Sequence, residues 1–439
     1  MKKFFAILLL IAAGCTNIQD AQPENRNSFV YFYPSTLNSI SVASALDQDG
    51  GVVMIGYRSN SLIDLTNPTM VVIKTDARGK TVWQKEFTDA ATDSLYGKAV
   101  KPVADGYLIA ADRIKVKLNT AINVTTTDYS IHFYKMDLQG NITFTFEQNE
   151  SSGNYFANSI TTDASGSVVL LGTKVSGLNR ESVVSIFTPT GSGYTLSWSQ
   201  AFDLQTRNYT NGRSVQLTPD NNIIWASSIT TDATARSYAA FPVVAPGSTF
   251  TNNRLLGEND DTNNLLVNDL QRNNVGFATV GTNYTILTGT TTANKNFFFA
   301  RLGNNGNIVS TSYYDDGTSI NATDLANLSK PEFNTLEDGG LAVAPAQDGS
   351  YLLVGYLESR PAIGGQVARG NGGKDVSLIK IDAFGSVQWY KTYGGIGDEV
   401  ANSAFQATDG GFIITGTSTV QGFASMFVMK VNASGELSN

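Results

Sequence analysis

A glycine-punctuated repeat of about 60 residues runs through almost the whole chain and constrains its fold more than any other feature. Each repeat contains a short strand, a tight turn, an apolar strand that usually ends in Gly, a variable loop, a third strand, a second turn and a fourth strand. We expect the first turns near Gly50, Gly106, Gly166, Asn221, Thr282, Gly349 and Gly410. Seven units therefore predict seven copies of one four-stranded sheet.

The repeat predicts an all-β protein, a seven-bladed β-propeller of antiparallel four-stranded blades, with six or eight blades as alternatives. No long stretch with a 3.6-residue apolar period follows the N-terminal segment, which argues against helices. The fourth repeat fits worst, because Pro242 and Pro246 interrupt its third strand. The expected second strands are residues 52–56, 107–111, 168–172, 223–227, 284–289, 351–355 and 412–416.

The two ends of the chain are expected to share one blade. The seventh repeat lacks a full fourth strand, and the first strand candidate, residues 29–33, belongs to no complete repeat. We expect residues 29–33 to pair antiparallel with residues 427–431, which removes the exposed edges that an open array would leave.

The motifs of the repeat resemble those of a known protein class. Residues 389–395 read W-Y-K-T-Y-G-G, residues 409–416 read D-G-G-F-I-I-T-G, and parts of both patterns recur in the first repeat. They resemble the repeats of secreted bacterial β-propellers that are common in Bacteroidota lipoproteins. The resemblance implies a propeller outside the cytoplasm and no single activity, because propellers host binding, scaffolding and catalysis alike.

The N-terminus predicts export. Lys2 and Lys3 precede an apolar run over residues 4–13, which is too short to span a bilayer and is typical of a signal peptide. The run ends in A-A-G-C and resembles a lipobox, although Ala12 stands where Leu is usual. By that resemblance, residues 1–14 are the signal peptide, Cys15 is the lipidated residue, 15–27 form a flexible tether and 28–439 form one propeller domain. An ordinary secretory signal is the alternative.

The expected address is the bacterial outer membrane, through the lipid on Cys15. Acidic residues soon after a lipidated cysteine resemble surface-export signals, which favours the cell surface over the periplasmic side. The formal net charge of −8, which becomes −10 when Lys2 and Lys3 are removed, argues against a nucleic acid as partner. Cys15 is the one cysteine, so the chain forms no internal disulfide.

The longer connections all fall on one face of the predicted propeller. In a four-stranded blade, the connections from second to third strand and from blade to blade share a face, which we call the long-loop face. Its expected insertions are 111–128, 174–181, 258–274, 315–337 and 357–374. Loops on a rigid scaffold often carry binding sites, with neutral insertion as the alternative. The ligand-binding candidates on this face are Arg58, Arg113, Arg207, Tyr356, Arg360 and Asp398.

Most other chemistry-bearing residues have a structural interpretation. Trp83, Trp198 and Trp389 occupy one fourth-strand position in three repeats, which indicates packing between blades rather than sugar stacking. Asp47 and Asp49 belong to a hairpin turn rather than a calcium loop. The cluster of Glu258, Asp260 and Asp261 is interpreted as a solvated loop, with a weak cation site as the alternative.

Signatures of an enzyme are few. The single histidine, His132, lies in a predicted strand, and no zinc ligand set, cysteine–histidine pair or phosphate-binding loop is present in the sequence. We therefore predict a non-catalytic protein with no metal and no cofactor. The predicted function is a lipid-anchored binding protein for a glycan or peptide. The alternatives are an envelope protein–protein scaffold and, less favoured, a glycan-active enzyme that uses carboxylates.

Overall fold

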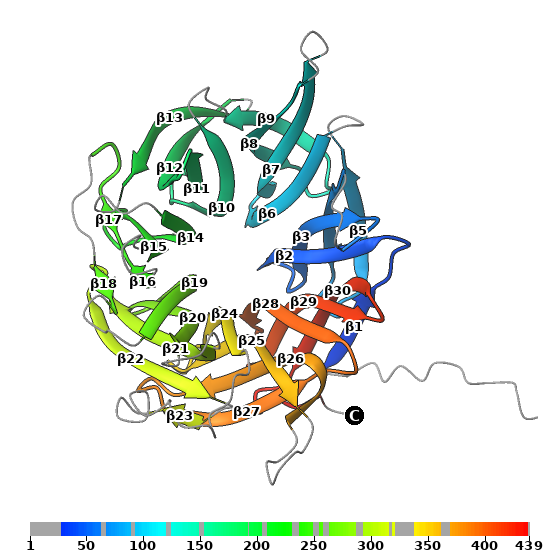
Figure 1. The fold of residues 1–439 in the computed structure, drawn as a ribbon, viewed down its shortest axis with the longest axis vertical. Helices are drawn as coiled ribbons and strands as arrows, with labels where there is room; N and C mark the ends of the chain where they lie inside the picture. Colours follow the sequence, from blue (N-terminus) through cyan, green and yellow to red (C-terminus); the bar gives the residue numbers. More distant parts are fainter. Residues whose placement is uncertain are drawn as a thin grey trace, which may run out of the picture.

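The computed structural model is a closed ring of seven blades (Figure 1), and residues from the first strand of every blade line a central channel. It describes residues 28–62, 67–88, 93–119, 124–148, 153–191, 193–203, 209–230, 237–248, 254–257, 263–286, 293–315, 318–320, 338–360 and 369–437. Every element in these ranges is a strand or a turn, so the predicted all-β class is confirmed. The predicted seven blades of four antiparallel strands are confirmed as well.

The first three blades follow the chain in order. Blade 1 holds β2 (Asn38–Leu46), β3 (Val52–Ser59), β4 (Thr69–Thr75) and β5 (Thr81–Phe87). Blade 2 holds β6 (Asp93–Val103), β7 (Gly106–Asn119), β8 (Val124–Met136) and β9 (Ile142–Gln148). Blade 3 holds β10 (Asn154–Thr162), β11 (Val168–Ser176), β12 (Asn179–Thr190) and β13 (Gly193–Phe202). In each blade the first strand lines the channel.

Blade 4 is the irregular one, as the prolines predict. It holds β14 (Tyr209–Leu217), β15 (Ile223–Thr230), β16 (Ser237–Ala240), β17 (Val243–Val244) and β18 (Leu255–Leu256). β16 and β17 both pair with β15, and the break between them falls at Phe241 and Pro242. Because proline has no backbone N–H, the third strand cannot continue through that position.

The remaining blades complete the ring. Blade 5 holds β19 (Asn263–Asn273), β20 (Gly276–Ile286), β21 (Ala293–Gly303), β22 (Ile308–Asp315) and the short β23 (Thr318–Ile320). Blade 6 holds β24 (Asp338–Pro345), β25 (Tyr351–Arg360), β26 (Arg369–Ile381) and β27 (Val387–Tyr393). Blade 7 holds β28 (Asp398–Gln406), β29 (Phe412–Val420), β30 (Phe423–Val431) and β1 (Phe29–Tyr33).

The N-terminal strand closes the ring as predicted. β1 pairs antiparallel with β30, with Phe32 opposite Phe427 and Val30 opposite Met429. The Tyr33 side chain is buried between blades 7 and 1, and its hydroxyl donates a hydrogen bond of 2.6 Å to the carbonyl oxygen of Gly79. Closure therefore joins the two ends of the described chain through both a strand ladder and a core contact.

The hydrophobic core consists of seven clusters, and each one lies between two successive blades. The tryptophans belong to these clusters, as expected. Trp83 of blade 1 packs on Tyr107 of blade 2 at 5.8 Å and donates to the carbonyl oxygen of Leu138. Trp389 packs in the same way on Phe412 of blade 7. Their indole rings hold neighbouring blades together.

Hairpins of one geometry cover the face opposite the long-loop face, which we call the short-turn face. In the hairpin at Asp47, the Gly50 N–H donates to the Asp47 carbonyl oxygen at 3.1 Å, and ten turns within the described ranges, this one included, show the same pattern. Gly50 has φ near +80°, a region that favours glycine. Lys74 pairs with Asp47 at 3.0 Å and Asp49 at 2.7 Å, so these carboxylates hold a lysine in place of a metal.

Two details of the sequence prediction are wrong. The first turn of blade 5 lies at Asn274 and Val275, before β20 begins at Gly276, and not near Thr282. The second strand is therefore Gly276–Ile286 and not 284–289, and most of the expected insertion 258–274 is the first strand β19. An asparagine-rich turn replaces Asp-Gly there, which hid it from the pattern. The expected insertion at 111–128 is mostly an extension of β7 and β8, which pair up to Asn119 and Val124 and project beyond the ring (Figure 1). Alternating β-branched residues allow that hairpin to continue.

Candidate functional site

Each of the seven channel-lining strands carries one β-bulge at the same level of the ring. The ladder shifts by one residue in β2, β6, β10, β14, β19, β24 and β28. The extra residues are Val42, Lys98, Asn158, Arg213, Asn268, Leu341 and Asn402, and all seven line one cavity. Because a bulge residue has no partner in the ladder, it re-aims its side chain. The ring of bulges thus makes the channel wall.

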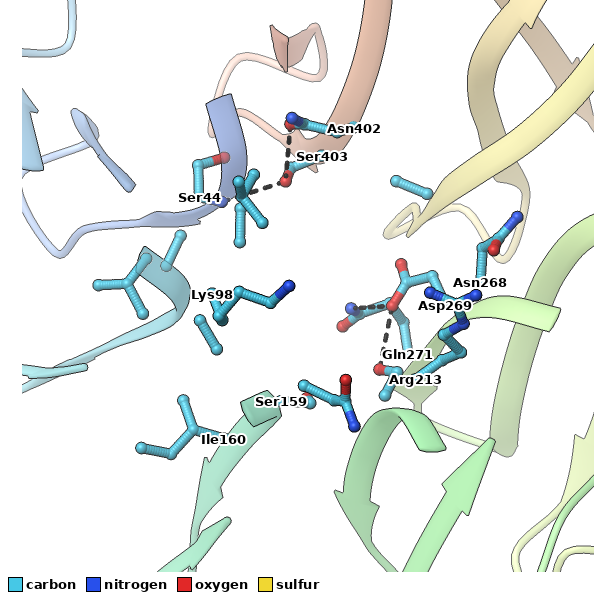
Figure 2. Close-up of a pocket in the computed structure, with 18 of the residues that line it drawn as sticks. Ser44, Lys98, Ser159, Ile160, Arg213, Asn268, Asp269, Gln271, Asn402 and Ser403 are labelled. Carbon is cyan, nitrogen blue, oxygen red and sulfur yellow. Dashed lines mark hydrogen bonds between the residues drawn. The ribbon is translucent and has the colours of Figure 1, made fainter. Parts of the chain in front are cut away.

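The cavity in the channel has a volume of about 380 Å³ and a polar lining (Figure 2). Amides, hydroxyls and cations dominate it. Its charged side chains are Lys98, Lys101, Arg213 and Asp269, so cations outnumber carboxylates among the described lining residues. This balance is opposite to that of the whole chain, whose formal net charge is −8.

Several lining residues are committed to holding blades together. The Asn268 amide donates to the carbonyl oxygen of Gly340 at 2.8 Å, and the Asn402 amide donates to that of Ser41 at 2.6 Å. The Ser403 hydroxyl accepts the Ser44 N–H at 3.1 Å. These bonds cross from one blade to the next around the channel. The asparagines at these bulges therefore have a structural role.

Asp269 is likewise fixed by neutral donors. Its carboxylate accepts bonds from the N–H of Leu270 at 2.8 Å and of Val343 at 3.1 Å, the second from blade 6. It also accepts bonds from the Gln271 amide and the Ser214 hydroxyl (Figure 2). Burial is the main influence on this group and raises its pKa, which the hydrogen bonds oppose.

A second carboxylate, Asp112, lies behind the wall of blade 2. Its Oδ2 is 3.6 Å from the Lys98 Nζ, and its Oδ1 accepts the Ala157 N–H at 2.6 Å. Burial raises the pKa of Asp112 to about 6, against the opposing effect of Lys98. The charge that faces Lys98 therefore titrates near neutral pH.

A row of aromatic rings follows the seams of blades 1, 2 and 3 toward the long-loop face. Tyr57 and Tyr96 meet edge to face at 4.9 Å, and Tyr129 and Phe156 lie 5.1 Å apart. All four side chains are half-buried. Tyr96 and Phe156 stand two residues before the bulge residues Lys98 and Asn158, which line the cavity, so the row shares the inner strands β6 and β10 with it. Burial raises the pKa of Tyr96 to about 12, so its hydroxyl is neutral at pH 7.

The two described arginine candidates are engaged within their own blades. Arg58 is 3% exposed, donates from Nε to the Ser39 hydroxyl at 2.8 Å and pairs with Glu86. The Arg113 guanidinium donates twice to Asp93, at 3.0 and 2.6 Å. Both guanidinium groups brace the long-loop ends of β-strands, which leaves little charge available to a ligand.

Tyr356 and Asp398 lie on the long-loop face of blades 6 and 7. The Tyr356 ring is half-buried beneath the Lys374 Nζ, which stands 4.3 Å from its centroid. Asp398 is exposed and accepts the Lys374 N–H at 2.8 Å. Arg360 is the last residue of β25, and its side chain lies outside the described part, as do Arg207, Cys15 and the cluster at 258–261.

The sequence reasoning missed the channel residues. A usable signal was present: the bulge is flanked by small residues in G-K-A at 97–99, A-N-S at 157–159, G-R-S at 212–214 and A-N-S at 401–403. Small neighbours let the inner strands approach around the channel, so the residue between them faces the cavity. His132, by contrast, is buried and contacts the Tyr134 hydroxyl at 2.9 Å, which agrees with its structural interpretation.

A second cavity, of about 660 Å³, lies at the seam of blades 6 and 7. Its lining is largely apolar and includes Val30, Phe32 and Phe423, which are 38%, 53% and 43% exposed. This apolar seam runs along the strand that closes the ring. It is an exposed apolar patch of the kind that protein partners cover.

The described ranges contain neither a cluster of metal ligands nor a membrane-spanning helix. Within those ranges, no three His, Cys, Asp or Glu side chains are grouped so that they could hold a metal ion. Also within them, no helix has the length and apolar character needed to cross a bilayer.

Comparison with known proteins gives fold likeness alone. No protein-family model matches the chain, and no curated protein matches it. A protein of unknown function from Dyadobacter fermentans is similar in structure, with 11% identity over 92% of this chain and 97% of the other and a TM-score of 0.49. An α-L-arabinofuranosidase of Fusarium graminearum is 12% identical over 94% of this chain and 100% of the other, with a TM-score of 0.43. An ulvan lyase is 11% identical over 65% of this chain and 67% of the other, with a TM-score of 0.42.

Proposed function

We propose that this protein is a lipid-anchored binding protein outside the cytoplasm that takes a glycan on its long-loop face. The observation that carries the proposal is that two surfaces of different chemistry share the inner strands β6 and β10. Tyr96 and Phe156 of the half-buried aromatic row stand two residues before Lys98 and Asn158, which line the polar cavity in the channel. A sugar ring presents C–H groups on its faces and hydroxyls at its edges, so it can use both surfaces at once.

The strand order supports an orientation that suits surface binding. β1 runs antiparallel to β30, with Phe29 opposite Lys430, so the chain enters the propeller from the short-turn face. The 13 residues from Cys15 to Asn27 reach at most about 45 Å when fully extended. A lipid on Cys15 would hold the short-turn face toward the membrane and turn the long-loop face away from it.

Truncation of one aromatic ring tests the proposal. Full-length protein in detergent is screened on a glycan array, and the saccharides bound are titrated against the wild type and Tyr96→Ala. We expect a loss of affinity of about 10-fold or more, because truncating a ring that anchors a ligand typically costs at least 1–2 kcal/mol.

The control is Phe384→Ala, which removes an aromatic ring that is 85% exposed on the short-turn face. Its affinity should equal that of the wild type. Equal affinity for wild type and Tyr96→Ala would show that the glycan does not use this row.

The apolar seam supports a second candidate function, an envelope scaffold. A pull-down that compares the wild type with Phe32→Asp tests the scaffold function, because the Phe32 side chain is exposed in the apolar seam. A glycan-active enzyme with two carboxylates has weaker support, because Asp269 is the one carboxylate among the described lining residues of the channel cavity. If no glycan on the array binds and the pull-down recovers a protein partner in a stoichiometric amount, the scaffold function is favoured.

A further inference from the structure

The channel holds positive charge that the described protein does not neutralise. Lys101 and Arg213 line the cavity, and neither side chain makes a hydrogen bond or an ion pair within the described residues. Lys98 has one partner, Asp112, at 3.6 Å. Lys98 and Lys101 are partly buried and Arg213 is exposed on the channel wall, so all three cations are accessible to a ligand in the channel.

The nearest carboxylates do not supply the missing counter-charge. Asp269 accepts four hydrogen bonds from neutral donors, and burial raises its pKa. Asp112 is behind β6 and faces Lys98 alone among the three cations. Burial lowers the pKa values of Lys101 and Arg213, as expected for cations without a partner, and Arg180 adds to the effect on Arg213.

The three cations line the same cavity from two blades. Lys98 and Lys101 come from blade 2 and Arg213 from blade 4, with blade 3 between them. Blade 3 presents Asn158, Ser159 and Thr161 to the same cavity. Figure 2 shows the Lys98 amino group pointing into the cavity and Ser159 on the neighbouring strand. Cations flanking an amide and hydroxyls are the donor set that oxyanions bind.

We propose that the cavity binds an oxyanion between blades 2 and 4, and that the ligand of the long-loop face is an acidic saccharide whose carboxylate or sulfate group enters it. This inference rests on the proposed function for the identity of the ligand as a saccharide. The oxyanion itself could also arrive as a free inorganic anion. In either case Lys98, Lys101 and Arg213 neutralise it, and Asn158 and Ser159 can donate hydrogen bonds.

The test uses two probes that differ in charge alone. Oligogalacturonate and its methyl ester are titrated by calorimetry into the full-length protein in detergent, and sodium sulfate is titrated separately. We expect the acid to bind at least 10-fold more tightly than the ester. We also expect sulfate to compete with the acid, and both affinities to fall as sodium chloride is raised.

Arg213→Gln is the variant that locates the anion. It should weaken the binding of acid and sulfate at least 10-fold and leave the thermal midpoint unchanged, because the Arg213 side chain is exposed and makes no hydrogen bond or ion pair within the described residues. Arg78→Gln, at an exposed residue of the short-turn face, makes the same charge change and should alter neither. A strongly lowered midpoint in Arg213→Gln would mean that the arginine has a structural role and would overturn the proposal.

The outcomes separate this inference from the proposed function. If acid and ester bind equally and Arg213→Gln has no effect, the oxyanion site is refuted while glycan binding stands. If sulfate binds in a manner that depends on Arg213 but no saccharide on the array binds, the oxyanion site stands and the glycan proposal fails. If neither sulfate nor the acid binds, the oxyanion site is refuted.

Discussion

Replacing Asp112 with Asn should change how stability depends on pH, in a direction that the structure determines. Burial of Asp112 raises its pKa from 3.8 to about 6, with Lys98 and the Ala157 N–H opposing the shift. The folded protein thus holds this proton more tightly than the unfolded chain does. The stabilising contribution is present below pH 3.8 and is lost as the pH rises through about 6.

The size of the effect follows from the shift. A difference of about two pKa units corresponds to about 3 kcal/mol, at 1.36 kcal/mol for each unit. The free energy of unfolding of wild type minus that of Asp112→Asn should therefore fall by about this amount between pH 4 and pH 7. Asn retains an oxygen that can accept the Ala157 N–H, so the comparison mainly removes the titration.

Urea unfolding at pH 4, 5, 6 and 7 measures this difference. Asp105→Asn is the control, since Asp105 is 67% exposed and pairs with Lys135 at the surface. Its difference from wild type should stay nearly constant over the same range. A wild-type-minus-Asp112→Asn difference that is flat or rises with pH would refute the reasoning.

Two further predictions concern the architecture. Tyr33→Phe removes the hydroxyl that donates to the Gly79 carbonyl oxygen and should lower the free energy of unfolding by about 1–2 kcal/mol. The control, Tyr31→Phe on the same strand, should lower it by less than about 0.5 kcal/mol. Equal effects of the two variants in urea unfolding would contradict the closure contact. Gly394→Ala should cost about 1–3 kcal/mol, because an added Cβ would stand 1.7 Å from Oδ1 of buried Asp375. The control is Gly191→Ala, whose added Cβ would meet nothing within 4 Å, and it should leave the thermal midpoint unchanged. Similar thermal midpoints for the two variants would contradict the crowding at Gly394.

The blade count and the ring closure could be predicted because they depend on local patterns. A hairpin such as the one at Gly50 needs a residue in the left-handed region, which is glycine in most blades and Asn221 in blade 4, so the spacing is visible in the sequence. Closure followed from a missing strand at one end and an extra strand, Phe29–Tyr33, at the other. The turn at Asn274 escaped because Asn can replace Asp-Gly without leaving the usual signature.

The site was harder to predict because it is assembled from single residues about one blade apart. Lys98 and Arg213 come from different blades, and the small residues that flank each of them are the one local signal along the chain. Arg58 and Arg113 looked equally suitable in the sequence, yet Glu86 and Asp93 engage them. Partners of this kind depend on strand register and on a one-residue bulge, which alternation patterns do not specify. The face on which each connection lies, in contrast, follows from the order of the strands alone.

A crystal structure of the full-length protein with the tightest-binding saccharide from the array tests the central proposal most directly. We predict electron density for a sugar against Tyr96 and Phe156, with an acidic group in the cavity beside Lys98 and Arg213. Density confined to the apolar seam at Phe32, or to the short-turn face, would contradict the proposed glycan site in the channel.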